Sequence, residues 1–253
     1  MAQMTQAALD TYISAAGSSR EEIGAATRGA REVVVYCSAM DGLGTPTSDL
    51  DIYAIRDPGH LDEDTTAMRV AAGEVGPQGS LDVEWWDLST VTRICEAARA
   101  CRARLDDLKV LHRLQAGIML TAPLPGEVKT TAGGVGLQSP VITCLSLLAD
   151  DELRSQEGFA STGDWRPGLL AARRAVTYAV MAWCAHEGQL LFKEKWLMTV
   201  LQRSWPQMAA RYWHALSLSR ESDVPRVLDF FSDLKNSFDG QGSARPHDRT
   251  VTR

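Results

Sequence analysis

Two short apolar runs near the start of the chain, 32–37 and 50–56, are the feature that most restricts its fold. The first, EVVVYC, is rich in β-branched residues, and the second, LDIYAIR, is apolar at most positions, so each predicts a buried strand. Between them lie Gly42, Gly44 and several small polar residues, which predict a tight connection. The fold must therefore place two strands on either side of a glycine-containing turn.

Apolar patterns in the rest of the chain separate a part with strands from a part with helices only. In the N-terminal part we expect these further elements: helices over 4–16 and 20–30, a short helix within 67–75, a strand over 80–88 and a helix over 89–117. From 141 onward the apolar spacing is helical, most clearly over 166–188 and 222–238. This order predicts an α+β fold, in which a small mixed sheet flanked by helices is followed by an all-helical bundle.

A stretch rich in proline and glycine, 121–140, marks the boundary between the two parts. We predict a strand-containing domain over 1–120, a linker over 121–140, a helical domain over 141–238 and a tail over 239–253. The tail is rich in glycine, serine and charged residues, which predicts disorder.

The composition excludes some classes of function. A net charge of −6 argues against an electrostatic nucleic-acid binder, which needs basic surface to displace counterions from phosphates. The five cysteines show no metal-binding spacing and are interpreted as reduced thiols. The N-terminus has no signal-peptide pattern, and no apolar run is long enough to cross a bilayer. We therefore expect a cytoplasmic protein without a membrane partner.

Two aspartates, Asp49 and Asp51, stand one residue apart at the start of the second strand. Alternate residues of a strand project from the same face, roughly 6–7 Å apart along the chain. Their carboxylates would repel each other, and a divalent cation would offset that repulsion. Mg²⁺ prefers oxygen ligands and is commonly held by one or two carboxylates plus substrate phosphates. The pair predicts a magnesium site. The alternative is that Asp49 ends a turn and Asp51 lies at a solvated strand edge, with no metal bound.

Residues on both sides of this pair extend the pattern. Ser38 follows the first strand, and Gly42 and Gly44 would let backbone N–H groups approach a phosphate closely. On the third strand, Asp82 and Glu84 share one face. Strand carboxylates beside a phosphate-binding loop are the groups that nucleotidyl transfer requires, because they bind metal and accept the proton of the attacking hydroxyl.

The sequence resembles the DNA polymerase β-like nucleotidyltransferases, and within them the aminoglycoside nucleotidyltransferases of the streptomycin/spectinomycin type. Their signature is a strand, Gly-Ser, a glycine-containing turn, and Ser-Asp-hydrophobic-Asp or Glu. Here the matching residues are Ser38, Asp41-Gly42 in the turn, and Ser48-Asp49-Leu50-Asp51, with the family's eleven positions between Ser38 and Asp49. One departure is Cys37, which stands where the family has glycine.

The resemblance implies a role for each matched residue of the N-terminal part. Mg²⁺ would be bound by three carboxylates, those of Asp49, Asp51 and Asp82. The general base would be Asp82, which lies between Leu81 and Val83 as the family's base lies between Leu and Val, with Glu84 as the alternative. The nucleotide would contact four residues of the loop: Ser38, Asp41, Gly42 and Ser48.

In the helical domain, the resemblance implies a lysine that reaches the triphosphate five residues after a helix-ending glycine. Counted from Gly188 this is Lys193, with Lys195 as the neighbouring candidate. The alternative is that both lysines lie in a solvated first turn. The family's acidic residues that bind the acceptor have no match in a firm register, although the stretch 150–164 offers several carboxylates.

The implied activity is Mg²⁺-dependent transfer of a nucleoside monophosphate, with ATP as the expected donor, to a hydroxyl of a small molecule. The acceptor would be an aminoglycoside-like antibiotic or a natural-product intermediate, and the net charge of −6 is compatible with a cationic one. The protein would be a monomer or homodimer. Two alternatives stay open at this point. One is a nucleotidyltransferase acting on a protein or RNA, and the other is a non-catalytic nucleotide-binding module.

Overall fold

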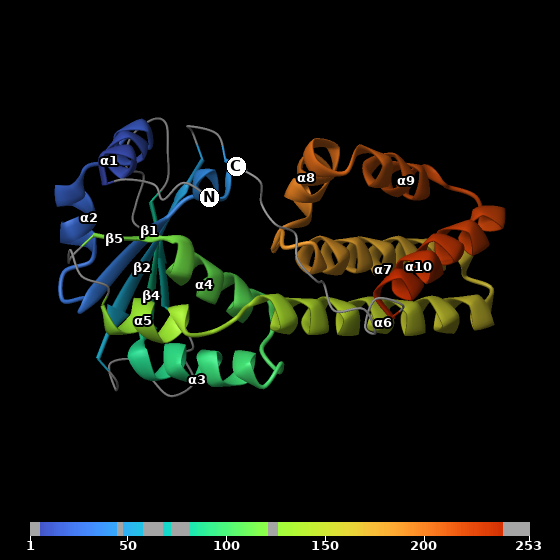
Figure 1. Ribbon diagram of the computed structural model, residues 1–253, viewed down its shortest axis with the longest axis horizontal. Coiled ribbons are helices and arrows are strands. Elements are labelled where there is room, and N and C mark those ends of the chain that lie inside the picture. Colours follow the sequence, from blue (N-terminus) through green and yellow to red (C-terminus); the bar gives the residue numbers. More distant parts are fainter. Residues whose placement is uncertain (1–5, 45–47, 58–67, 72–80, 121–125, 240–253) are drawn as a thin grey trace, which may run out of the picture. The chain divides into compact units, whose positions relative to one another are not determined.

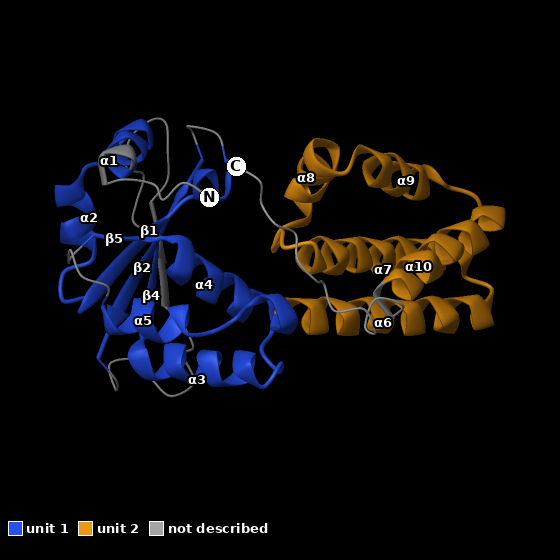
Figure 2. Ribbon diagram, in the orientation of Figure 1, with its two compact units in different colours: residues 1–140 blue, residues 141–253 orange. Residues whose placement is uncertain are grey.

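The computed structural model describes residues 6–44, 48–57, 68–71, 81–120 and 126–239, with the backbone alone at 6–8, 68–71, 81–82 and 238–239. The chain divides into two compact units, residues 1–140 and 141–253 (Figure 2). The first holds all the described strands, and the second is helical, so the fold is α+β, as the sequence predicts (Figure 1).

The first unit is built around one five-stranded mixed sheet. Its elements in chain order are α1 (Gln6–Ala15), α2 (Arg20–Ala26), β1 (Glu32–Tyr36), the 3-10 helix η1 (Ser38–Asp41), β2 (Leu50–Arg56), β3 (Met68–Ala71), β4 (Leu81–Asp87), α3 (Leu88–Arg99), α4 (Leu105–Ala116), β5 (Ile118–Met119) and α5 (Glu127–Gly133). The strand order is β3-β4-β2-β1-β5. The β2 and β4 pair is parallel, whereas the other three pairs are antiparallel.

The two faces of this sheet differ in character. One face carries an apolar core that includes Val33, Val35 and Ile52 from the strands and packs against α1 and α2. The other face lies toward α3, α4 and α5 (Figure 1). At the start of β2 this second face is polar, because Tyr36, Asp51 and Tyr53 contact polar groups there. The apolar side holds the sheet against α1 and α2, and the polar side joins the sheet to α4 through hydrogen bonds.

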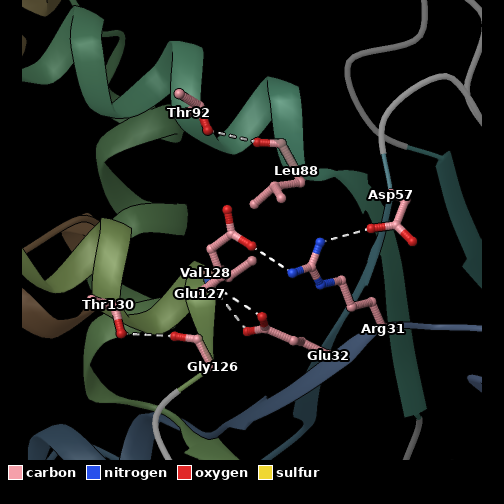
Figure 3. A network of polar contacts seen from close by, with 9 residues as sticks. All are labelled: Arg31, Glu32, Asp57, Leu88, Thr92, Gly126, Glu127, Val128 and Thr130. Carbon is pink, nitrogen blue, oxygen red and sulfur yellow. Dashed lines mark hydrogen bonds and ion pairs between the residues drawn. The ribbon is translucent and has the colours of Figure 1, made fainter.

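Buried and exposed carboxylates hold the short helix α5 against the sheet (Figure 3). The buried Glu32 of β1 accepts hydrogen bonds from the backbone N–H of Val128, which orients the first turn of α5. Gly126 is required beside it, since a Cβ there would lie 2.7 Å from Glu32 Oε1. Arg31 bonds Asp57 at 2.8 Å and Glu127 at 2.5 Å. These contacts join the beginning of β1, the end of β2 and α5.

The second unit consists of helices around the buried helix α7. Its elements are α6 (Gln138–Thr162), α7 (Trp165–His186), the 3-10 helix η2 (Glu194–Trp196), α8 (Leu197–Ser204), α9 (Pro206–Ser217), the 3-10 helix η3 (Glu221–Asp223) and α10 (Val224–Asp239). Gly188 adopts a left-handed conformation, φ +87°, just after α7, which confirms the predicted helix stop.

Most elements predicted from the sequence are confirmed, and two are corrected. Residues 68–71, predicted within a short helix, form the edge strand β3 because pairing with β4 overrides the local pattern. The helix predicted over 89–117 is two helices, α3 and α4, separated at Cys101, whose φ of 52° is left-handed. The predicted linker, 121–140, contains α5 and the beginning of α6. The predicted tail lies outside the described residues apart from Asp239.

Among the described helices, none is by itself long and apolar enough to span a membrane; α5 and α6, which meet at a bend of 68°, pass that test only when taken together.

Candidate active site

The described part of the loop after β1, Ser38 to Gly44, is folded tightly from its first residue. Ser38 begins η1, and the backbone N–H of Leu43 donates to the Ser38 carbonyl at 3.1 Å. Gly42 has a left-handed φ of 71°, which closes the turn. Gly44 returns against the start of the loop, where an added Cβ would lie 2.6 Å from Ser38 Oγ. The loop thus brings a serine hydroxyl and glycine backbone together with no side chain between them.

Asp41, predicted to contact the nucleotide, turns its carboxylate toward the protein. Its Oδ2 accepts a hydrogen bond from Tyr36 Oη at 2.5 Å and lies 2.9 Å from His112 Nε2 of α4. The side chains of Asp41 and His112 are each 15% exposed. Asp41 therefore anchors the loop to β1 and to α4, while Oδ1, also buried, has no hydrogen-bond partner among the described residues.

The two aspartates at the start of β2 occupy different environments. Asp49 precedes the strand and is exposed, whereas Asp51 lies within it and is half-buried. Asp51 Oδ1 accepts a hydrogen bond of 2.8 Å from Arg113 Nη1 of α4. Ser48 is half-buried just before Asp49. The expected carboxylate pair is thus one exposed aspartate and one aspartate in an ion pair.

Arg113 joins the acidic residue of β2 to its neighbours. Its Nη1 also donates to Tyr53 Oη at 2.6 Å, and its guanidinium carbon lies 5.2 Å from the ring centroid of Tyr36. Burial alone would lower the pKa of Arg113, but Tyr53 and Asp51 outweigh that effect and raise it. The guanidinium is therefore a permanent positive charge at the site.

The register of β2 and β4 aligns the predicted acidic residues. Asp82 pairs with Asp51 and Glu84 pairs with Tyr53 in the parallel ladder. Glu84 is half-buried, and its Oε2 accepts a hydrogen bond of 3.2 Å from Trp86 Nε1. The side chain of Asp82 lies outside the described residues. The backbone register thus places position 82 directly beside position 51, and position 84 two residues further into the sheet.

Burial also sets the protonation of the groups around the loop. The pKa of Tyr36 is raised, first by burial and then by the charge of Asp41, so the phenol stays a donor. For Asp41, burial favours the neutral acid, but the hydrogen bonds from His112 and Tyr36 prevail and lower its pKa. Burial also raises the pKa of the Cys37 thiol. The loop is therefore anchored by the Asp41 carboxylate, which contacts Tyr36 at the end of β1 and His112 of α4.

The candidate lysines lie in the second unit, after α7. Lys193 is exposed and directly precedes η2, and Lys195 is exposed within η2. The Lys195 ammonium lies 5.0 Å from the ring centroid of Trp196. Lys193 lies five residues after Gly188, at the predicted offset, and Lys195 lies two residues further along the same unit.

The carboxylates of the stretch 150–164 are largely engaged within the helical unit. Asp150 pairs with Lys235 at 2.9 Å, and Glu152 pairs with Arg174 at 2.9 Å. Asp151 pairs with Arg154 at 3.1 Å on the same helix. These contacts connect α6 to α7 and α10 and neutralise part of the acidic stretch.

The donor set is suited to Mg²⁺ that arrives with a nucleotide. Among the residues whose side chains are described, no group of three His, Cys, Asp or Glu residues could hold a metal by itself. Mg²⁺ needs only one or two carboxylates when phosphates supply further oxygens. Asp49 and Asp51 offer these, next to a loop that has no side chain at Gly44. The residues therefore fit a cation shared with a triphosphate.

Sequence reasoning did not identify His112 and Arg113. They lie next to each other on α4, and Arg113 falls among the buried positions of that helix with Leu111 and Leu114. A cation on the apolar side of a helix requires a buried anion, because an unpaired buried charge is very costly. An arginine among the buried positions of α4 could therefore have indicated a buried ion pair from the sequence. It could not have identified Asp51 as the anion.

Comparisons with known proteins support the fold. No protein-family model matches the sequence, and no curated protein matches it. Six chains of solved structures match. One is a nucleotidyltransferase-like protein from Exiguobacterium sibiricum 255-15, with a TM-score of 0.50 and 12% identity over 87% of this chain and 74% of that one. At this identity the likeness concerns the fold, and the fold of this chain is nucleotidyltransferase-like.

Proposed function

We propose that the protein is a nucleotidyltransferase that moves a nucleoside monophosphate, with ATP as the donor, to a hydroxyl of a small molecule. The observation that carries the proposal is the register of the parallel strands β2 and β4, which sets Asp82 beside Asp51, next to the Ser38–Gly44 loop. The nucleotidyltransferase-like fold of the chain supports the same reading.

In the proposed reaction the acceptor hydroxyl attacks the α-phosphorus of the nucleotide. A new oxygen–phosphorus bond forms, the bond between the α-phosphorus and the bridging oxygen breaks, and pyrophosphate leaves. Asp82 accepts the proton of the hydroxyl, with Glu84 as the alternative base. Ser38, Gly42 and Ser48 bind the phosphates, and the loop keeps its shape because Asp41 is anchored to α4.

Asp49 and Asp51 would hold the divalent cation. Bound Mg²⁺ would neutralise the charge of the triphosphate and the negative charge that develops during transfer. By the resemblance to the family, Lys193, with Lys195 as the neighbouring candidate, would contribute positive charge to nucleotide binding. The acceptor belongs to the class of hydroxylated antibiotics or natural-product intermediates.

The direct test incubates the protein with each nucleoside triphosphate, Mg²⁺ and a panel of hydroxylated antibiotics, followed by mass spectrometry. The expected result is an acceptor whose mass increases by one nucleoside monophosphate, together with pyrophosphate. Asp49→Asn should abolish this product. Asp57→Asn is the matched control, because Asp57 is an exposed carboxylate after the other end of β2 and its ion pair with Arg31 lies at the surface.

Two results would refute the proposal. One is nucleotide binding without any transfer across the panel, which would favour the non-catalytic alternative. The other is equal product formation by wild type and Asp49→Asn, which would remove the assigned cation ligand from the reaction.

A further inference from the structure

Helix α4 reaches two different parts of the candidate site through consecutive residues. His112 contacts Asp41, which anchors the loop after β1, and Arg113 contacts Asp51, in β2. The partners are separated from the helix by 71 and 62 positions in sequence. One helix thus fixes the loop and the acidic strand relative to each other.

The guanidinium of Arg113 is held in place from several sides. Its side chain is 7% exposed, the lowest value for a cation in the ion pairs formed by described residues. Nη1 is shared between Asp51 Oδ1 and Tyr53 Oη, and the Tyr36 ring lies near the guanidinium. A surface arginine can swing away when a ligand arrives, whereas this one is confined by packing and by two acceptors.

This confinement has two electrostatic consequences for Asp51. Without a cation bound, Arg113 neutralises Asp51 and keeps its carboxylate in a single orientation at the end of the loop. When a divalent cation approaches Asp51, the fixed guanidinium repels it. Burial weakens the screening of that repulsion by solvent.

We infer that Arg113 is a built-in counter-cation of Asp51, which positions this carboxylate before a divalent cation binds and sets how weakly the cation is held. The inference rests on the proposed function, since it takes Asp51 as a ligand of the cation. Arg113 is a positioning residue in this account, because it acts on the cation and the nucleotide through Asp51.

The test measures cation affinity directly, in the full chain and without turnover. Mn²⁺ is titrated against wild type, Arg113→Gln, Arg113→Lys and Asp51→Asn, with free Mn²⁺ measured by electron paramagnetic resonance in the presence of a non-hydrolysable ATP analogue. Arg113→Gln and Arg113→Lys both lose the planar fork and its packing, but only lysine keeps the charge. The two variants therefore separate charge from geometry.

We expect Arg113→Gln to bind Mn²⁺ about tenfold or more tightly than wild type, since removal of a nearby buried charge relieves repulsion. Arg113→Lys should stay within about threefold of wild type, because the charge is retained. Equal affinities in wild type and Arg113→Gln would overturn the inference, and so would identical changes in both Arg113 variants.

If the proposed function is wrong because Asp51 is not a cation ligand, wild type and Asp51→Asn should bind Mn²⁺ with the same affinity. That result would also refute the inference about Arg113. If an Arg113 variant does not fold, wild-type protein labelled with ¹⁵N-arginine provides the second measurement. Addition of Mg²⁺ with the nucleotide analogue should move the side-chain resonance of Arg113 in its NMR spectrum, while the exposed Arg31 serves as the reference. An unmoved Arg113 resonance would refute the inference.

Discussion

Replacing Asp51 by asparagine should destabilise the N-terminal unit, whereas the same change at Asp49 should not. The sequence alone suggests that both changes would leave the fold intact, because each removes a charge from a pair of like charges. The structure separates them: Asp49 is exposed, and Asp51 pairs with Arg113 at 2.8 Å. Asp51→Asn leaves the buried guanidinium without its counter-charge.

The magnitude follows from the burial of this pair. Removing one partner of a fully buried ion pair costs about 3–5 kcal/mol. Here Asp51 is 18% exposed, the asparagine oxygen can still accept from Arg113, and Tyr53 continues to bond the guanidinium. We therefore expect a loss of about 2 kcal/mol for Asp51→Asn and less than about 0.5 kcal/mol for Asp49→Asn.

The assay should report on the two units separately. Tryptophan fluorescence does not, because tryptophans occur in both units. Hydrogen exchange followed by mass spectrometry reports on peptides of β2 and α4 separately from peptides of the helical unit. Asp51→Asn should lower protection in β2 and α4 and leave α7 unchanged. A double-mutant cycle with Arg113→Gln should give a coupling energy of about 1–3 kcal/mol. Equal protection in the Asp49 and Asp51 variants, or a coupling near zero, would refute the reasoning.

Three further predictions address catalysis, the nucleotide and pH. Asp82→Asn should lower kcat by about 10²- to 10⁴-fold with little change in the Mg²⁺ concentration that gives half-maximal activity. Glu84→Gln should lower kcat less, and a larger loss in Glu84→Gln than in Asp82→Asn would make Glu84 the base. Lys193→Ala should raise KM for the nucleotide in steady-state assays while Lys195→Ala changes it little, and the opposite pattern would shift the assignment by two residues. Because the pKa of Asp41 is lowered in the folded state, its carboxylate stabilises the fold above about pH 4 and loses this effect below. Urea unfolding between pH 5 and pH 3 should show the difference between wild type and Asp41→Asn shrinking, and a growing difference would contradict this.

The elements that local patterns specify were predictable from the sequence. The strands β1 and β2 follow from β-branched and apolar runs, and the end of α7 follows from Gly188. Strand β3 was not predictable, because its four residues form a strand only by pairing with β4. A short edge strand takes its conformation from its neighbour more than from its own composition.

The candidate site shows the same division between local and distant information. The loop from Ser38 to Asp51 could be found because its spacing lies within one short stretch of sequence. The partners that fix it come from α4, and no local pattern connects Arg113 to an aspartate 62 positions away. For Asp41, the motif predicted a nucleotide contact, and only the fold shows Tyr36 and His112 at its carboxylate.

The pairing of β2 with β4 also determines which shifts in strand register would be opposed by the apolar core. A slip of one residue would exchange the two faces of β4 and expose Val83 and Trp85, so the apolar core opposes it strongly. A slip of two residues would keep the faces but bring Glu84, in place of Asp82, opposite Asp51. Hydrophobic burial distinguishes these two registers poorly, since both leave apolar residues inside. The observed register therefore depends on how individual large side chains, such as Trp85, pack against their neighbours, and not on hydrophobicity alone.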